Sequence, residues 1–369
     1  MIRVLNIISD TNIGGAGRVV LNYLKYADRE HFETLVAVPR GSLLKEPIEA
    51  LGIQVYEVDA IADRSYDKED VAVLQNLIYE LKPDIVHTHG TMSGRIAAKR
   101  CGVKTVFTRH SVFPVSPKIH YPPGRWINKW ANEYYSDRII AVSPAAAQNL
   151  IDGGVSPKKI TTIMNGVAAV PRASGEICDA LREKWDLKKD IFTAGIMARL
   201  EPYKGHLYII DAVEKLKADG RNIQVLIAGV GAYEQTLREE VIRRGLQNEI
   251  IFVGFQTDVA PLLSVMDVQL NASYGTEATS LALLEGLSMG VPAIVSNYGG
   301  NPWVIDDGED GLLFANRSAE GLYQCLRRLM DEPQTLSKMS ERAKEIFAQR
   351  FTGEIFAANI EKVYREMKG

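Results

Sequence analysis

An alternation of short apolar runs and amphipathic stretches, which occurs twice along the chain, constrains the fold most strongly. The first series begins with the apolar run 4–8 and the second with the run 192–197. Repeated strand–helix alternation predicts parallel sheets with helices on both faces. In such sheets ligands bind beyond the carboxyl ends of the strands. We therefore expect an α/β protein whose functional residues follow its strands.

The chain length indicates two domains. At 369 residues it is too long for one average domain and suits two of similar size. Residues 168–176 contain proline, serine and glycine without clear periodicity, which is typical of a linker. We assign 1–170 to the first domain and 171–350 to the second. The amphipathic tail, 353–369, is predicted to pack back on the first domain.

Composition excludes several functional classes. The net charge of −3 gives no reason to expect nucleic acid as a partner. The three cysteines are widely spaced and odd in number, which predicts reduced thiols and neither a disulfide framework nor a metal site. No apolar run approaches about 18 residues, and the first residues enter a strand without a signal-peptide pattern. We expect a cytoplasmic enzyme, with the cytoplasmic face of a membrane as the other candidate location.

Two glutamates mark the start of a predicted helix, 278–289. Glu277 and Glu285 are eight residues apart, about 12 Å along one helix side. That exceeds the roughly 9.5 Å limit for two carboxylates that flank one glycosidic bond. Such a pair suits an elongated ligand, whose phosphates would meet the amides at the positive helix end. Those amides belong to Ala278, Thr279 and Ser280. An ordinary amphipathic helix with one capping glutamate is the alternative.

A glycine-rich segment, 14–17, follows the first strand. A strand, glycine loop and helix present backbone amides to an anionic ligand, so Gly15 and Gly17 are candidates for phosphate contact. The dinucleotide fingerprint requires a third small residue where Val20 stands. This departure argues against a nicotinamide dehydrogenase more than against nucleotide binding in general. A tight turn without a ligand is the alternative.

Histidines occur at two strand ends of the first half. His87 and His89 alternate on one predicted strand and face the same side, but no third metal ligand is evident. His110 directly follows another predicted strand and stands next to Arg109. We therefore predict no metal site and take His110 as the site candidate.

Residues 118–130 combine basic and aromatic side chains. Trp126 and Trp130 are four residues apart and share a helix face, with Arg125 and Lys129 beside them. This combination is typical of contact with a membrane interface or a lipid-linked substrate. An aromatic stripe packed in the core is the alternative.

Cations follow the first strand of the second half. Arg199 and Lys204 stand beside a predicted helix N-terminus, where they could neutralise a phosphate. Solvated surface charge is the alternative. Gly229 lies in a glycine turn after the next strand, and Phe255 ends the strand after that, where its ring could pack on a flat base.

Taken together, these segments strongly resemble the retaining GT-B glycosyltransferases of family 4. The matching segments run in family order across almost the whole chain, and their combination is far more specific than any one of them. The segments are 14–18, 84–90, 165–167, 198–205, 228–231, 252–255, and Glu277 and Glu285 with 290–292.

The resemblance implies a GT-B fold, with two Rossmann-like domains facing across a cleft. A nucleotide-diphosphate sugar, held mainly by the second domain, is the co-substrate, and no further cofactor is implied. Such enzymes are thought to transfer with retention by front-face departure, without a separate nucleophile. The chain has no Asp-x-Asp motif for a divalent ion, so cationic side chains and amides must handle the diphosphate.

The family pattern also implies roles for individual residues. Arg199 and Lys204 would neutralise the diphosphate, and Glu285 would bind the ribose. Glu277 and the amides after it would hold the sugar, which His110 would contact. The loop at Gly15 and Gly17 would close on the phosphates. Two positions depart from the pattern, because many relatives carry glutamate where Gly17 and Trp303 stand here.

The sequence therefore predicts a hexosyltransferase-type enzyme that moves a sugar from a nucleotide-diphosphate donor to a glycan or lipid-linked acceptor. Cell-envelope polysaccharide or glycoconjugate synthesis is the expected setting, with peripheral contact of 118–130 with the inner membrane. A GT-B nucleotide-sugar epimerase and a non-catalytic sugar-binding relative are the alternatives.

Overall fold

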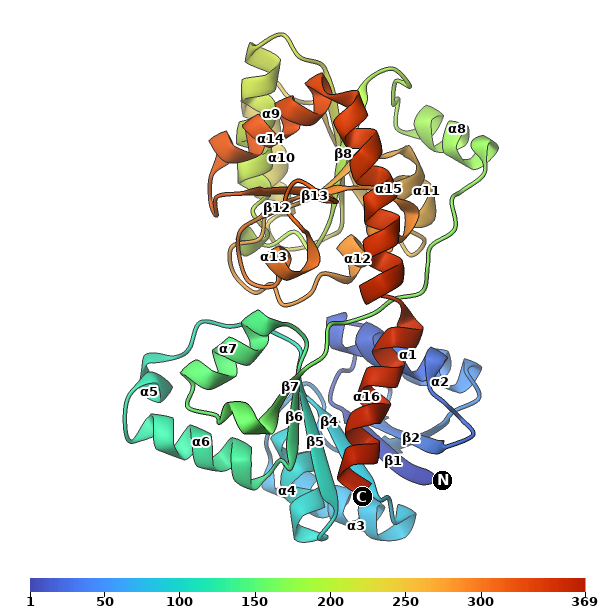
Figure 1. Ribbon diagram of the computed structural model, residues 1–369, viewed down its shortest axis with the longest axis vertical. Coiled ribbons are helices and arrows are strands. Elements are labelled where there is room, and N and C mark those ends of the chain that lie inside the picture. The colour runs from blue at the N-terminus through green and yellow to red at the C-terminus, as the bar shows by residue number, and fades with distance from the viewer. Residues whose placement is uncertain (369) are drawn as a thin grey trace. The chain divides into compact units, whose positions relative to one another are not determined.

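The computed structural model describes residues 1–368; Gly369, the last residue of the predicted tail helix, lies outside the described residues. The chain divides into two compact units (Figure 1). Unit 1 comprises Met1–Val167 and the chain from Phe351 onward, and unit 2 comprises Ala168–Arg350. Each unit is built around one parallel sheet with its own core, as the alternation of strands and helices predicts.

The sheet of unit 1 has seven strands in the order β3-β2-β1-β4-β5-β6-β7, and all pairings are parallel. Its strands are β1 Ile2–Ile8, β2 Phe32–Pro39, β3 Gln54–Val58, β4 Ile85–His89, β5 Lys104–Arg109, β6 Arg138–Ala141 and β7 Ile160–Thr162. Its α-helices are α1 Gly15–Tyr26, α2 Lys45–Ala50, α3 Lys68–Leu81, α4 Met92–Arg100, α5 Pro117–His120, α6 Gly124–Tyr134, α7 Pro144–Asp152 and α16 Gly353–Lys368.

The sheet of unit 2 has six strands in the order β10-β9-β8-β11-β12-β13, again all parallel. Its strands are β8 Phe192–Met197, β9 Ile223–Ala228, β10 Ile250–Gly254, β11 Val268–Asn271, β12 Ala293–Ser296 and β13 Gly311–Phe314. Its α-helices are α8 Gly175–Lys184, α9 His206–Ala218, α10 Glu234–Arg243, α11 Ala260–Val265, α12 Leu281–Met289, α13 Asn301–Val304, α14 Ala319–Asp331 and α15 Pro333–Arg350. The predicted pair of parallel sheets is confirmed.

The C-terminal helix α16 completes unit 1. Figure 1 shows it in red beside α1. Tyr364 lies edge-on to Tyr23 at 6.2 Å between ring centroids, and its hydroxyl is 2.6 Å from Nδ1 of His87 on β4. Tyr364 is fully buried. A helix from the end of the chain therefore covers a sheet built from its beginning.

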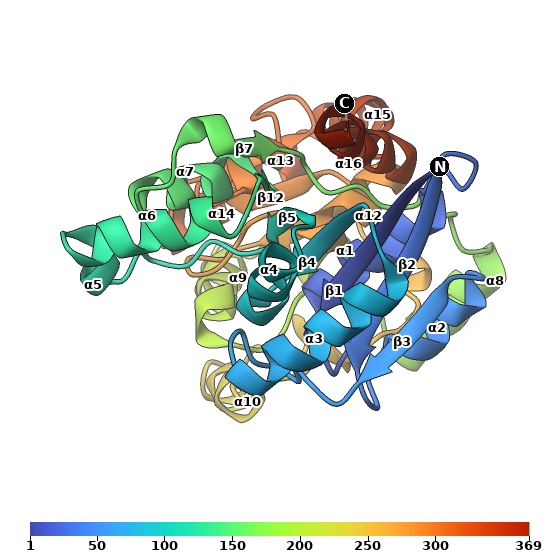
Figure 2. The same ribbon diagram turned by 90° about the horizontal axis from the view of Figure 1, so that it is seen from below.

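Helices α5, α6 and α7 lie at one end of unit 1. Figure 2 shows α5 and α6 at the side away from α2 and β3, in agreement with the strand order, in which β3 and β7 are the two edges. Helix α6 leaves large side chains uncovered: Trp126 is 65% exposed and Trp130 is 55% exposed. The alternative of an aromatic stripe packed in the core is therefore wrong.

Several helices begin at other residues than predicted. Helix α1 starts at Gly15, with Gly14 as its N-cap, so Gly15 and Gly17 form its first turn and not a loop. Helix α12 starts at Leu281, three residues after the predicted start, because the Ser280 hydroxyl caps it by accepting from the amide of Leu283. Helix α8 begins inside the predicted linker, where the hydroxyl of Ser174 caps it.

Candidate functional site

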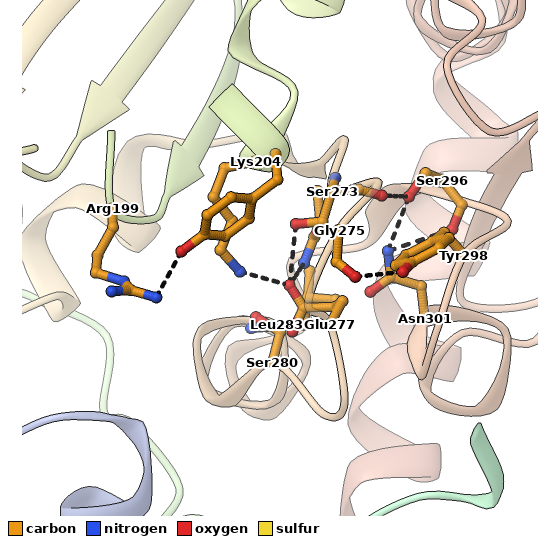
Figure 3. A network of polar contacts seen from close by, with 12 residues as sticks. Arg199, Lys204, Ser273, Gly275, Glu277, Ser280, Leu283, Ser296, Tyr298 and Asn301 are labelled. Carbon is orange, nitrogen blue, oxygen red and sulfur yellow. Dashed lines mark hydrogen bonds and ion pairs between the residues drawn. The ribbon is translucent and has the colours of Figure 1, made fainter. Parts of the chain in front are cut away.

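In unit 2 a buried carboxylate lies directly beyond the carboxyl end of β11. The side chain of Glu277 is 7% exposed, and its Oε2 accepts three hydrogen bonds. The donors are Lys204 Nζ at 2.9 Å, Ser273 Oγ at 3.0 Å and Asn271 Nδ2 at 3.2 Å (Figure 3). Within residues 1–368 no side chain or amide donates to its second oxygen, Oε1. This leaves one carboxylate oxygen for a ligand.

Backbone contact holds Lys204 against this strand end. Its neighbour Gly205 adopts a positive φ of 76°, and a Cβ there would lie 2.0 Å from the carbonyl oxygen of Ala272. The amide of Tyr274 donates to the carbonyl of Tyr203 at 2.8 Å. Only glycine permits this approach, which joins the segment after β8 to the segment after β11. The two strands are neighbours in the sheet although far apart in the sequence.

A glycine pair, Gly299 and Gly300, fixes the Glu277 segment from the other side. The amide of Gly300 donates to the carbonyl of Glu277 at 3.0 Å, and a Cβ on Gly300 would lie 1.4 Å from the carbonyl oxygen of Ala278. The hydroxyl of Tyr298 donates to the carbonyl of Gly275 (Figure 3). The glycine pair thus serves close backbone packing. The sequence showed the pair, but not what it packs against.

Arg199 and a buried histidine accompany Lys204. The Arg199 side chain is exposed, and its Nη2 donates to the hydroxyl of Tyr203 at 2.8 Å. His206 is 1% exposed, and neither of its ring nitrogens has a hydrogen-bond partner within the described chain. Burial, together with the charge of Lys204, lowers the pKa of His206 to about 4. His206 is therefore neutral near pH 7, and the cations beside it are Lys204 and Arg199.

Helix α12 follows Glu277 in the chain and starts later than expected. Glu277 precedes the helix instead of lying on it, so its predicted separation of about 12 Å from Glu285 along one helix side does not hold. Ala278 and Thr279 are buried in the irregular segment before the N-cap, Ser280. The amides that open the helix are those of Leu281 and Ala282. Glu285, on the second turn, is partly exposed.

The other donor-site candidates of unit 2 also follow strands of its sheet. Gly229, after β9, adopts a φ of 141°, and a Cβ there would lie 1.9 Å from the carbonyl oxygen of Ala198. Phe255, after β10, is 60% exposed. The carboxyl ends of four neighbouring strands therefore lead into the segments that contain Arg199 and Lys204, Gly229, Phe255 and Glu277.

In unit 1, His110 belongs to a row of three neighbouring histidine rings. Its Nε2 lies 2.9 Å from Nδ1 of His89, and the ring centroids of His89 and His87 are 4.2 Å apart. Burial, and secondly the charge of Arg109, lowers the pKa of His110 to about 4. Burial lowers the pKa of His87 to about 3. These rings are neutral near pH 7, which suits hydrogen bonding to a sugar hydroxyl better than proton donation.

The two glycines predicted to contact phosphate differ in their surroundings. A Cβ on Gly15 would meet no heavy atom within 4 Å, so its surface is open. A Cβ on Gly17 would lie 2.9 Å from Cδ2 of Leu44, and Gly17 is buried. Gly17 therefore has a packing role between α1 and the residue before α2. Within residues 1–368 no group of three or more histidine, cysteine or acidic residues is arranged to hold a metal ion.

Comparison with known proteins identifies two family models that match the chain in succession. The model "Glycosyltransferase Family 4" matches residues 13–169, and the model "Glycosyl transferases group 1" matches residues 179–346. Between them these ranges cover most of both units.

Similar proteins include two curated enzymes. The chain is 28% identical over 299 residues to the UDP-Gal:alpha-D-GlcNAc-diphosphoundecaprenol alpha-1,3-galactosyltransferase of Escherichia coli, covering 77% of this chain and 76% of that protein. It is 24% identical over 370 residues to the alpha-monoglucosyldiacylglycerol synthase of Acholeplasma laidlawii, covering 88% and 92%.

Two solved structures share the fold across the whole chain. A glycosyltransferase from Rickettsia africae ESF-5 matches with a TM-score of 0.86 at 20% identity, covering 99% of this chain and 98% of that chain. Anabaena Alr3699/HepE in complex with UDP-glucose matches with a TM-score of 0.84 at 21% identity, covering 99% and 100%.

Proposed function

The chain belongs to glycosyltransferase family 4 and has the GT-B fold, and on that premise we propose that it transfers the sugar with retention and without a metal ion. The donor is a nucleotide-diphosphate sugar and the acceptor a glycan or a lipid-linked sugar. UDP is the nucleotide we favour, because the E. coli relative is named for UDP-Gal and the Anabaena structure holds UDP-glucose.

The buried Lys204–Glu277 pair carries this proposal. Lysine has three donors, and one bond to Glu277 leaves two for the donor diphosphate. Arg199 adds a second cation, and the N-terminus of α12 adds a positive helix end. The free Oε1 of Glu277 accepts a sugar hydroxyl, and Glu285 accepts the ribose hydroxyls. All of these groups lie beyond strand ends, where ligands of parallel sheets bind.

The chemistry needs no nucleophile from the protein. The acceptor hydroxyl attacks the anomeric carbon on the face from which the diphosphate leaves, and a departing phosphate oxygen takes the hydroxyl proton. The C–O bond to phosphate breaks as the new glycosidic C–O bond forms. Lys204 and Arg199 stabilise the charge that develops on the diphosphate, which is electrostatic catalysis of the oxyanion-hole type. His110, as a neutral ring, positions the sugar.

The donor assignment is tested by thermal shift with UDP-, GDP- and ADP-sugars, because a ligand at 100 times its Kd raises the unfolding free energy by about 2.7 kcal/mol. Stabilisation by UDP-sugars alone is expected. Product analysis by NMR then reports the anomer, and the same assay is run with EDTA. An inverted anomer would overturn the retaining mechanism, and loss of activity in EDTA would overturn metal independence.

Epimerisation is not favoured as the alternative activity, because the curated relatives are named as transferases and synthases. An epimerase releases free altered sugar or nucleotide in the absence of any acceptor. A reaction that needs an acceptor for sugar release separates the two activities.

We also propose that α6 brings the enzyme to a membrane that carries the acceptor. Trp126, Ile127 and Trp130 are more than half exposed on this helix, beside the cations Arg125 and Lys129. Exposed aromatic and basic side chains on one helix suit an anionic membrane interface. Within residues 1–368 no helix is long and apolar enough to cross a membrane. The proposed contact is therefore peripheral.

The membrane proposal is tested by sedimentation with anionic phosphatidylglycerol vesicles. Replacing both Trp126 and Trp130 with alanine should reduce binding about tenfold or more, since each ring buries apolar area at the interface. Tyr79→Ala on α3 is the matched control, because Tyr79 is 58% exposed and lies on another helix. Equal binding of all three proteins would remove the proposal.

A further inference from the structure

Unit 1 contains two buried or partly buried arginines without an acidic partner among residues 1–368. Arg95, on α4, is only 6% exposed, and Arg109, at the end of β5, is partly buried. Within residues 1–368 no carboxylate oxygen lies within 4.0 Å of either guanidinium. A buried charge without a counter-ion costs several kcal/mol, so proteins rarely retain one without a use.

Among residues 1–368, the hydrogen-bond and ring partners of these guanidinium groups are neutral. Arg95 lies 4.1 Å from the ring centroid of Phe107, and its Nη1 donates to Oδ1 of Asn132 at 3.0 Å. Arg109 Nη2 donates to Oδ1 of Asn149 at 3.2 Å. The Nε of each arginine is buried without a hydrogen-bond acceptor within the described residues. Each arginine therefore has one N–H group without an acceptor, and the two positive charges repel each other.

The titration of nearby groups reflects the same excess of positive charge. Burial, and then repulsion from Arg109, lowers the pKa of Arg95 to about 10. Burial lowers the pKa of Arg109, whose charge in turn contributes to the low pKa of His110. A bound anion would offset this positive charge and raise the pKa of each of these groups.

The N-terminus of α7 adds to the positive potential. The amide of Val142, just before the helix, lies 3.4 Å from the carbonyl of Arg109, so α7 starts beside the end of β5. Ser143 caps the helix through the amide of Ala146, and the first amides of a helix are the positive end of its dipole. Asn149, which Arg109 contacts, lies on the same helix.

We propose that Arg109, backed by Arg95 and the start of α7, binds a phosphate or diphosphate group of the acceptor substrate. This inference rests on the proposed function, because it specifies the acceptor of that reaction. Arg109 adjoins His110 at the ligand-binding edge of the sheet, whereas the donor diphosphate has its own cations in unit 2. Asn132, the partner of Arg95, lies on α6, which also presents Trp126 and Trp130. An acceptor with a lipid-linked diphosphate would therefore meet both features of unit 1.

Pyrophosphate is the probe that tests the site. Calorimetric titration is performed with saturating UDP, so that the nucleotide occupies the donor site first. Arg109→Gln and Arg95→Gln should each weaken pyrophosphate binding at least about tenfold, the loss expected for one charge-assisted hydrogen bond. Arg100→Gln is the matched control, because this arginine is on the exposed side of α4 and donates to Oε1 of Gln75.

Stability measurements separate a binding role from a structural one. If Arg109 is there to bind an anion, Arg109→Leu should leave the melting temperature of the unliganded protein unchanged or raise it, because an unpaired charge is removed. If its hydrogen bond to Asn149 serves only to hold α7, the melting temperature should fall by several degrees. That fall, combined with undiminished pyrophosphate binding, would overturn the proposal.

Two further ligands distinguish the source of the phosphate. Farnesyl diphosphate in detergent micelles represents a lipid-linked acceptor, and glucose 1-phosphate represents a free phosphorylated sugar. Competition of either ligand with pyrophosphate supports the site and identifies the class. Failure of all three ligands to bind, in a protein that still binds UDP, would refute this site and leave the donor assignment intact. Failure of UDP alone would count against the donor assignment only.

Discussion

The two units handle buried charge in opposite ways. In unit 2, Lys204 and Glu277 form an ion pair at 2.9 Å, and two further side chains donate to the same carboxylate oxygen. In unit 1, the hydrogen-bond and ring partners of Arg95 and Arg109 within residues 1–368 are amides and aromatic rings. The ion pair of unit 2 fixes the position of its side chains without a ligand. The two arginines of unit 1 instead produce a positive potential that would attract an anion. The first arrangement suits preorganised catalysis and the second suits selection of a charged substrate.

The units share one device, a neutral histidine placed beside the cation. His206 stands next to Lys204, and His110 stands next to Arg109, and in both cases burial and the neighbouring charge lower the pKa to about 4. A neutral ring next to a cation adds polar contacts without adding charge. Four sets of variants test this difference between the units.

The largest effect is expected at the paired site. Lys204→Ala and Glu277→Ala should each reduce kcat/KM by about 10³-fold or more, because each removes preorganised electrostatic stabilisation. Both proteins should stay folded by circular dichroism but melt at lower temperature, since the remaining partner is left buried and unpaired. Lys215→Ala is the control, because its pair with Glu320 is about half exposed and contributes little. Full activity in either site variant would overturn the donor assignment.

A second large effect is expected where the Glu277 segment packs on the glycine pair. Gly300→Ala should lower the unfolding free energy by a few kcal/mol and weaken UDP-sugar binding, because its Cβ would overlap the carbonyl of Ala278 at 1.4 Å. Gly175→Ala in the same unit is the control, since a Cβ there meets nothing within 4 Å. If both variants melt and bind alike, close backbone packing does not hold Glu277 in place.

The pH dependence of stability is expected to be intermediate. For a histidine with a pKa lowered to about 4, folding excludes the proton that the unfolded chain binds below about pH 6.5. His110 thus contributes on the order of 3 kcal/mol to the free energy of unfolding above about pH 6.5. This contribution is lost as the pH falls from about 6.5 to about 4. His110→Gln should remove part of this acid loss in thermal melts, as should His206→Gln in unit 2.

The exposed His120 provides the control for this series, because within residues 1–368 it forms no ion pair with a carboxylate. His120→Gln should change the pH dependence of the melting temperature less than His110→Gln does. A direct NMR titration that placed the pKa of His110 above 6 would contradict the explanation by burial.

The smallest effect is expected at the open glycine of unit 1. Gly15→Ala has space for its Cβ and lies in the first turn of α1, so stability should be unchanged or rise by less than about 1 kcal/mol. If the start of α1 contacts the donor phosphates, the added methyl group should raise the donor KM several-fold at constant melting temperature. An unchanged KM would remove Gly15 from the site and leave the cations of unit 2 as the main phosphate ligands.

Local sequence patterns predicted much of the fold. Strand β4 contains His87 and His89, as predicted, and the next residue, Gly90, ends it. The start of α12 was missed because Ala278 favours a helix, while the hydroxyl of Ser280 caps the chain three residues later. Helix α13 was missed because it is only four residues long.

The site was less predictable, because its contacts are long-range. Lys204 and Glu277 were candidates on their own, but their bond requires β8 and β11 to be neighbours, and strand order does not follow from local propensity. The lack of counter-ions at Arg95 and Arg109 could not be predicted either, because the sequence shows a charged residue but not whether its side chain is buried. Fold class is encoded in local periodicity, whereas charge pairing depends on the tertiary structure.

The position of α16 has a consequence for how the protein is made. Residues 168–350 form unit 2 as one continuous segment, so this unit can fold as soon as it leaves the ribosome. Unit 1 cannot be complete at that time, because Tyr364 is still missing from the buried side of His87 and Tyr23. The part synthesised first is therefore finished last, and a nascent chain would expose the apolar surface of α1 until translation reaches its final helix.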